Sequence, residues 1–168
     1  MEAILANNYD KPSNEYYPTP EYTVLDLFEV IPMRRDWTYL EPCRGEAKSF
    51  YKYMPEGSQW AELSEGVDYL TTKFEHVDCI ITNPPFSLSV PFLEKSFTEA
   101  DVIIYLQRAN FLGSKKRKEF WNANKPDALI TLTKRPKFKG SRNDMTEYCY
   151  YIWDRKNRLG LEDTFYFV

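Results

Sequence analysis

The sequence predicts an α/β fold with a doubly wound, mostly parallel sheet, and three observations support it. Short apolar runs rich in β-branched residues recur along the chain and are typical of buried strands, most clearly at 77–82. Stretches with helical spacing alternate with them, as in a parallel sheet covered on both faces. The 168 residues, 43% of them hydrophobic, can build one domain with a sizeable core, and we expect a single domain over 1–168.

The predicted elements follow one another through short turns, after a polar, Tyr-rich arm or loop over 1–18. The first helix starts at Thr19-Pro20, with Thr19 as N-cap and Pro20 at the first helical position, and stops at Pro32. Further helices are expected at 47–54, 88–97 and 115–121, and strands at 38–40, 58–63, 68–70, 77–82, 102–106, 129–132 and 148–153. The last two strands, joined by a basic stretch, are expected to form an antiparallel hairpin at one edge.

Several protein classes are excluded by composition. No apolar stretch reaches transmembrane length, and the first ten residues lack the apolar core of a signal peptide, so we expect no membrane partner. The three cysteines are far apart and there is one histidine, so no metal site is predicted. Reduced thiols fit a cytoplasmic location, which would be the host cytoplasm if the protein is viral.

Charge is strongly segregated along the chain. Residues 1–107 contain 8 basic and 18 acidic side chains, whereas 108–142 contain 11 basic and 2 acidic ones, a net charge of +9. This asymmetry indicates a surface for a polyanion such as nucleic acid, although a solvated basic surface is the simpler alternative. Phe138 lies within the basic run and either stacks on a base or anchors the core. The candidate nucleic-acid-binding residues are Arg108, Lys115, Lys116, Arg117, Lys118, Lys134, Arg135, Lys137, Phe138, Lys139 and Arg142.

The most specific motif is Asn83-Pro84-Pro85-Phe86, which directly follows the predicted strand 77–82. Open α/β sheets bind their ligands at the carboxyl ends of their strands. Asn83 offers a side-chain carbonyl, the prolines leave backbone carbonyls free as acceptors, and Phe86 provides a face for a ring. Two acceptors that bind both N–H bonds of a planar amine would aim its lone pair at an electrophile and stabilise developing positive charge. A Pro-stiffened turn with a packed aromatic is the alternative.

A cofactor pocket is predicted at the ends of the first two strands. Glu41-Pro42-Cys43-Arg44-Gly45 follows the first strand, where a glycine lets the backbone approach a ligand closely. Glu62 ends the second strand, where an acid typically binds the two hydroxyls of a ribose. Asp68 is placed to accept a hydrogen bond from an adenine amine.

In their order, these motifs resemble the S-adenosylmethionine-dependent amino methyltransferases that act on DNA adenine, and especially small phage-type enzymes. The resemblance covers roughly 16–155. It implies a class I methyltransferase fold, a Rossmann-like sheet of seven strands whose seventh strand is antiparallel. It also implies that Tyr17-Pro18-Thr19-Pro20 contacts the cofactor and that the loop at 40–47 binds its methionine part. The resulting cofactor-binding residues are Thr19, Pro20, Glu41, Pro42, Gly45, Glu62, Asp68 and Asn83, with catalysis by Asn83, Pro84, Pro85 and Phe86.

Two departures from the family pattern bear on function. The methionine loop usually carries Gly-x-Gly, and Ala47 occupies the second glycine position here. No target-recognition domain is expected after the catalytic motif, so sequence selectivity would be slight, or come from the basic loops or from a partner protein.

The resulting hypothesis is methyl transfer to the exocyclic amine of adenine in DNA, on a flipped or single-stranded base. The same motif also occurs in methyltransferases that act on cytosine amines, RNA adenine or protein glutamine, and these remain alternatives. A further alternative is an inactive, methyltransferase-like nucleic-acid-binding protein, which Ala47 favours and the intact catalytic motif opposes.

Overall fold

The computed structural model describes residues 17–138 and 145–168, and its centre is a seven-stranded sheet in the order β2-β1-β3-β4-β6-β5-β7. The strands are β1 (Tyr39–Glu41), β2 (Gln59–Trp60), β3 (Val77–Thr82), β4 (Ala100–Arg108), β5 (Ala128–Thr131), β6 (Tyr148–Asp154) and β7 (Phe165–Phe167). Strand β6 is antiparallel to both of its neighbours, β4 and β5, and all other pairings are parallel. The predicted mostly parallel, seven-stranded α/β fold with an antiparallel hairpin is therefore confirmed.

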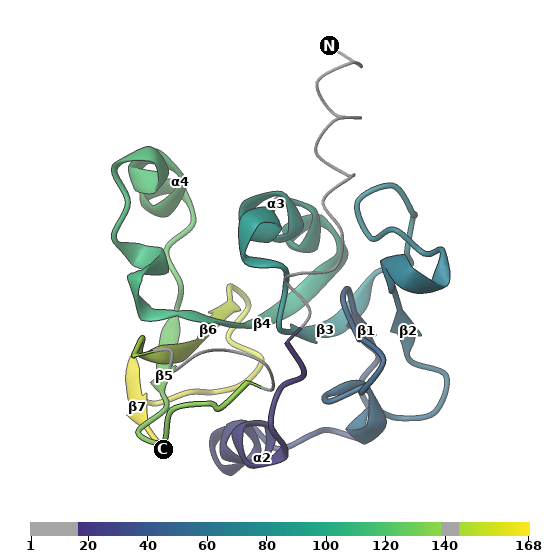
Figure 1. Ribbon diagram of the computed structural model, residues 1–168, viewed down its shortest axis with the longest axis horizontal. Coiled ribbons are helices and arrows are strands. Elements are labelled where there is room, and N and C mark those ends of the chain that lie inside the picture. Colours follow the sequence, from purple (N-terminus) through teal and green to yellow (C-terminus); the bar gives the residue numbers. More distant parts are fainter. Residues whose placement is uncertain (1–16, 139–144) are drawn as a thin grey trace.

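Helices cover both faces of this sheet. Helix α2 (Glu21–Val30) lies on one face, whereas α3 (Ser89–Glu99) and α4 (Lys118–Ala123) lie on the other (Figure 1). Strand β4 shows why two cores form: Val102, Ile104 and Leu106 join the α2 side, and Ile103 and Tyr105 join the opposite side. Successive side chains of a strand point to opposite faces, so a strand buried on both faces is apolar throughout.

The core on the α3 and α4 side is dominated by aromatic rings. Trp121 from α4 stacks on Trp153 of β6 with 6.2 Å between ring centroids and 4° between planes, and it also stacks on Tyr151. The indole N–H groups of both tryptophans reach backbone carbonyls, of Phe111 and Asn124 respectively. Buried tryptophans are stable where these donors are satisfied, so the stack fixes α4 firmly on the sheet.

Two predicted elements are wrong. Residues 68–70 form a turn, not a strand. The seventh strand is β7, which lies outside the β5–β6 hairpin at the edge of the sheet. It pairs with β5 in parallel, so the antiparallel strand is β6 and not the seventh strand that the resemblance implied. Residues 47–54 form turns and the short 3-10 helix η1 (Tyr51–Tyr53) in place of an α-helix. Lys48 has φ 51, a left-handed conformation that interrupts a right-handed helix. The remaining predicted strands agree with the structure to within a few residues, and 77–82 agrees at both ends.

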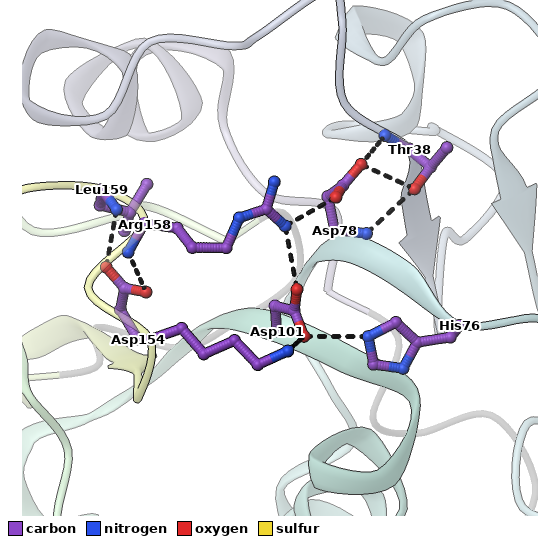
Figure 2. A network of polar contacts seen from close by, with 8 residues as sticks. Thr38, His76, Asp78, Asp101, Asp154, Arg158 and Leu159 are labelled. Carbon is purple, nitrogen blue, oxygen red and sulfur yellow. Dashed lines mark hydrogen bonds and ion pairs between the residues drawn. The ribbon is translucent and has the colours of Figure 1, made fainter.

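A polar network lies at the starts of β3 and β4, on the other side of the sheet from the ends of these strands (Figure 2). Arg158, which follows β6, donates hydrogen bonds from Nη1 to Asp78 Oδ1 at 2.6 Å and to Asp101 Oδ2 at 3.1 Å. Asp154 accepts hydrogen bonds from the backbone N–H groups of Arg158 and Leu159. The network therefore fastens the segment that leads to β7 onto the starts of β3 and β4.

Candidate active site

The predicted site residues gather at one edge of the sheet because of the strand directions. Strands β1, β2, β3 and β4 run parallel, so their carboxyl ends meet at one edge. Strand β5 is antiparallel to β6, and β6 is antiparallel to β4, so β5 ends at this edge as well. The segments that begin there are the two predicted cofactor loops, the Asn-Pro-Pro-Phe motif and both basic stretches.

Asn83, directly after β3, has its side-chain amide held in one orientation. Its Nδ2 group donates to the Tyr17 carbonyl at 3.3 Å and to Thr19 Oγ1 at 3.2 Å. The Tyr17 carbonyl can only accept, so it selects the NH₂ end of the amide. Among the described residues none donates to Asn83 Oδ1, so this oxygen is left as an acceptor.

The contact with Asn83 also explains why Thr19 does not cap the first helix. Pro20, with φ −58 and ψ 144, is the N-cap residue, and no side chain caps the helix. The helix thus begins one residue later than predicted, at Glu21. Thr19 is buried and its hydroxyl accepts a hydrogen bond from Asn83, so the N-terminal segment lies against the Asn-Pro-Pro-Phe motif.

The rest of the motif turns from β3 into α3. Pro85 has φ −58 and ψ 122, and the 3-10 helix η3 (Phe86–Leu88) follows it. Phe86 is half-buried, 6.3 Å from Tyr148 between ring centroids, and the guanidinium of Arg108 lies over its ring at 5.1 Å. The Phe86 ring can therefore share its face with a flat, cationic or π-bonded group.

Glu41, at the end of β1, is a buried carboxyl group whose negative charge is only partly balanced by its neighbours. It is 1% exposed, and its Oε2 has no hydrogen-bond partner among the described residues. Burial raises the pKa of Glu41 well above its usual range, although the Tyr51 backbone N–H and the Arg44 guanidinium oppose this shift. A buried acceptor in this state is suited to a cationic ligand group.

The loop after β1 continues through buried Pro42 to Gly45, where φ is 64, a conformation that favours glycine. The Gly45 N–H donates to Glu62 Oε2 at 2.8 Å, and Glu62 Oε1 accepts from the N–H and hydroxyl of Ser64. The predicted ribose ligand Glu62 therefore also joins the two loops. Its Oε2 retains a second lone pair for a ligand, whereas Oε1 already accepts two hydrogen bonds.

Asp68 lies half-buried just after Val67, which is bridged to Glu62. Its Oδ1 accepts from the Leu70 N–H at 2.9 Å. The structure thus places Asp68 beside the Glu62 loop, and Oδ2 receives no hydrogen bond from the described residues. Leu63, next to Glu62, is 59% exposed and offers an apolar surface at this position.

Arg44, in the loop after β1, joins the first two strands of the site. Its guanidinium stacks 3.4 Å from the centroid of the Trp60 ring and forms two hydrogen bonds with Glu65. Trp60 and Glu65 flank Glu62 in the chain, so Arg44 contacts the same segment that carries this predicted ligand. These contacts fix the end of β2 and the loop after it against the loop after β1, and no sequence pattern indicates them.

The basic stretches begin at the same edge. Lys115 and Lys116 lie exposed on the 3-10 helix η5 (Lys115–Arg117), which follows β4 and η4 (Ala109–Leu112), and Lys118 begins α4. Lys134 and Lys137 are exposed after β5. Tyr22 of α2 fixes this second stretch, since its hydroxyl accepts from the Lys137 N–H at 2.8 Å and donates to the Arg135 carbonyl.

Several predicted nucleic-acid ligands have internal contacts, among them Lys134, whose Nζ lies 3.8 Å from the centroid of the Tyr22 ring. Arg135 is paired with Glu147, and the Arg117 guanidinium lies 4.6 Å from the Phe111 ring. Phe138 is 5% exposed and packs on Tyr148 and Tyr17, so the structure favours the anchoring role that the sequence left open. Lys139 and Arg142 lie outside the described residues.

Some absences can be stated for the described residues. None of their helices is long and apolar enough to cross a membrane. Within the same ranges, no three His, Cys, Asp or Glu side chains are grouped so that they could hold a metal ion.

Known proteins resemble this chain in structure but not in sequence. No protein-family model and no curated protein sequence matches the chain. A Pyrococcus horikoshii protein assigned as an RNA methyltransferase superposes with a TM-score of 0.61 at 17% identity, over 92% of this chain and 98% of its own. A Listeria monocytogenes protein assigned to the class I S-adenosylmethionine-dependent methyltransferases gives 0.60 at 14% identity, over 90% of this chain and 64% of its own.

A third similar structure is the modification subunit of a type I restriction enzyme assigned in Vibrio vulnificus. It superposes with a TM-score of 0.59 at 16% identity, over 92% of this chain and 48% of the subunit. The chain therefore spans about half of this subunit and about two-thirds of the Listeria protein. At these identities the likeness concerns the fold, and the chain has the fold of the class I methyltransferases.

Proposed function

We propose that this protein transfers a methyl group from S-adenosylmethionine to the exocyclic N6 amine of adenine in DNA. The observation that carries the proposal is the amide of Asn83, fixed by Tyr17 and Thr19 with its oxygen left as an acceptor. The similar structures include methyltransferases assigned to RNA and a restriction-modification subunit, which supports nucleic acid as the substrate class.

The residues at the ends of β1 and β2 fit the cofactor. The unpartnered Oε2 of Glu41 is suited to the ammonium of its methionine part, directly or through water. Glu62 is suited to the ribose hydroxyls, and Asp68 to the adenine amine, while Leu63 offers an apolar contact for the adenine ring. When bound, S-adenosylmethionine supplies a methyl group on a sulfonium, which an amine lone pair can attack without prior activation.

The chain's own residues would act on the amine. An adenine amine is a weak nucleophile because its lone pair is delocalised into the ring. Asn83 Oδ1 and the Pro84 carbonyl would each accept one of its N–H bonds, and no described residue donates to that carbonyl. The two acceptors would direct the lone pair out of the ring plane and stabilise positive charge as the N–C bond forms and the bond between the methyl group and the sulfonium sulfur breaks. A neutral thioether would leave, and the methylated amine would lose one proton to water. Phe86 would stack on the base, after Arg108 has moved from its ring face.

The basic stretches support a polyanionic substrate. Lys115, Lys116 and Lys118 follow β4, Lys134 and Lys137 follow β5, and all five are exposed at the edge that carries Asn83. Lysines around the mouth of a site would bind backbone phosphates while the target base enters. They bind RNA phosphates equally well, so the choice of DNA depends on the resemblance of the motifs.

The test is methyl transfer by purified protein, with sequencing of DNA from expressing cells to detect modified bases. We expect N6-methyladenine in DNA, and Asn83→Ala should lower kcat by roughly a hundredfold or more while cofactor affinity stays within a few-fold. Asn122→Ala, an exposed position on α4, is the matched control. Near-normal turnover of Asn83→Ala would refute the catalytic assignment, and absence of cofactor binding by calorimetry would favour a pure binding module.

A further inference from the structure

A buried pair of polar side chains lies directly behind the catalytic motif and has no part in the function proposed above. Ser89, the first residue of α3, is 1% exposed, and Gln107, near the end of β4, is 2% exposed. Gln107 Nε2 donates a hydrogen bond to Ser89 Oγ at 2.5 Å. Such polar groups are costly to bury in an otherwise apolar core unless they are hydrogen-bonded.

A chain of hydrogen bonds runs from Gln107 of β4 through Ser89 to the motif. An amide nitrogen can only donate, so Ser89 Oγ accepts from Gln107 and its own proton remains for another acceptor. That acceptor is the motif itself: Ser89 Oγ lies 3.1 Å from the Phe86 carbonyl and 3.4 Å from the Pro85 carbonyl. Backbone N–H groups of Leu88 and Ser89 also donate to these two carbonyls.

The Pro84 carbonyl differs from the two carbonyls that follow it. Pro85 and Phe86 have their carbonyls turned inward to Ser89, whereas the Pro84 carbonyl receives no hydrogen bond from the described residues. The two prolines restrict the backbone between Asn83 and Phe86, so fixing the later carbonyls also fixes the earlier one.

We propose that Ser89 and Gln107 are positioning residues that set the Pro84 carbonyl and the Phe86 ring for the target amine. They act through the motif and do not touch the substrate. The proposal deepens the function proposed above and rests on it for its catalytic part. A small displacement of an acceptor from the reacting nitrogen is enough to lower the rate substantially.

The chain provides a matched control on the same helix. Ser96 of α3 is also fully buried, and its Oγ lies 3.0 Å from the Tyr69 hydroxyl and 2.6 Å from the Tyr105 hydroxyl, away from the motif. Ser89→Ala and Ser96→Ala each remove one buried, hydrogen-bonded hydroxyl from α3. A purely structural role predicts similar effects of both on melting temperature and on activity.

The positioning role predicts a difference between them. We expect Ser89→Ala to lower kcat roughly 10- to 100-fold with the cofactor Kd unchanged, and Ser96→Ala to keep kcat within about twofold. Gln107→Met, which keeps the side-chain length but cannot donate, should lower kcat in the same direction. In the Ser89→Ala background it should add little, because the two residues act in one chain of hydrogen bonds.

Hydrogen exchange of the peptide over 83–89 is a readout that needs no activity. We expect faster exchange in Ser89→Ala and Gln107→Met than in the parent and Ser96→Ala. Unchanged exchange, or unchanged kcat in an active enzyme, would overturn the proposal. If the parent protein transfers no methyl group, the proposed function and the catalytic part fail together, and the exchange data then decide whether the pair fixes the loop.

Discussion

Glu41 holds a carboxyl group in surroundings that oppose its charge. It is buried, its Oε2 lacks a partner among the described residues, and burial raises its pKa well above the usual range. Such an arrangement destabilises the protein where the carboxyl must ionise, so it is expected at a site where a ligand supplies the missing charge. Glu62 differs from it, because Gly45 and Ser64 already donate hydrogen bonds to its two oxygens.

Cofactor binding should depend on the carboxylates that follow β2. We expect Glu62→Ala and Asp68→Ala each to weaken S-adenosylmethionine binding by roughly tenfold or more, since a charged acceptor contributes about 1.5–3 kcal/mol. Calorimetric titration measures this. Glu62→Ala should have the larger effect, because it also releases the Gly45 loop.

Ala47→Gly is the companion to these variants. Ala47 is exposed and precedes Lys48, whose φ is positive. The Ala47→Gly variant should therefore bind the cofactor as tightly as the parent protein or more tightly. If Glu62→Ala and Asp68→Ala both bind like the parent, the cofactor pocket lies elsewhere.

Single residues also show the limit of reading a site from sequence. The motif at 83–86 and the acids at 41, 62 and 68 could be predicted, because their side chains follow strands whose pattern is clear. The roles of Ser89, Gln107 and Arg44 could not, because the Gln107–Ser89 and Arg44–Glu65 hydrogen bonds join residues 18 and 21 positions apart, which only the fold brings together. The Thr19-Pro20 pattern predicts a local helix cap, but the Thr19 hydroxyl accepts a hydrogen bond from the distant Asn83 amide instead.

At the scale of elements, strands were predicted well wherever apolar residues fill both faces, as in β3 and β4. The errors lie where a short segment takes its structure from its neighbours. The segment 47–54 has a helical apolar pattern, but Phe50 and Met54 reach the α2-side core from turns and a 3-10 helix. Strand β7 has three residues, and its pairing with β5 makes it a strand; no periodicity could indicate it.

The basic element after β4 gives a prediction of its own. Lys115, Lys116 and Lys118 lie exposed on η5 and at the start of α4, and neutralising all three should weaken DNA binding for every sequence. Each lost phosphate contact should lower the slope of log K against log salt by roughly 0.9 on duplex DNA. The measurement is binding by fluorescence anisotropy across a salt series.

Lys125→Ala, an exposed position after α4, is a suitable control for the loss of charge. A second set, Lys134 and Lys137, lies on the loop that Tyr22 fixes, and its neutralisation should also change which adenines are methylated. Unchanged affinity and salt slope in both sets would mean that the basic stretches are a solvated surface.

At the scale of the whole molecule, the two edges of the sheet have different tasks. The edge where β1 to β5 end carries the candidate site, where Glu41 Oε2 and the Pro84 carbonyl receive no hydrogen bond from the described residues. At the opposite edge Asp78 and Asp101 are paired with Arg158, and Lys156 and His76 also contact Asp101 (Figure 2). The polar groups at that edge stabilise the fold, and variants there should separate stability from activity.

Arg158→Ala tests this separation. The variant should lose about 1–2 kcal/mol of unfolding free energy at pH 7, because two partly buried carboxylates lose a shared donor and Trp37 loses a cation 4.3 Å above its ring. The kcat for methyl transfer should stay within about twofold. Lys156→Ala, which removes a more exposed partner of Asp101, should have a smaller effect on stability.

The pH dependence of that loss follows from the two aspartates. Burial opposes the charge of Asp78, but hydrogen bonds from Thr38 and Arg158 outweigh it and lower its pKa; the hydrogen bond from Lys156 is the main cause of the lowered pKa of Asp101. Their contribution is therefore complete above the usual carboxyl pKa of about 4 and is lost as the pH falls through the lowered folded values. Urea unfolding at pH 7 and at pH 3 should show the difference between parent and Arg158→Ala shrinking in acid. A difference of the same size at both pH values would show that Arg158 stabilises the chain through packing on Trp37 and not through the aspartates.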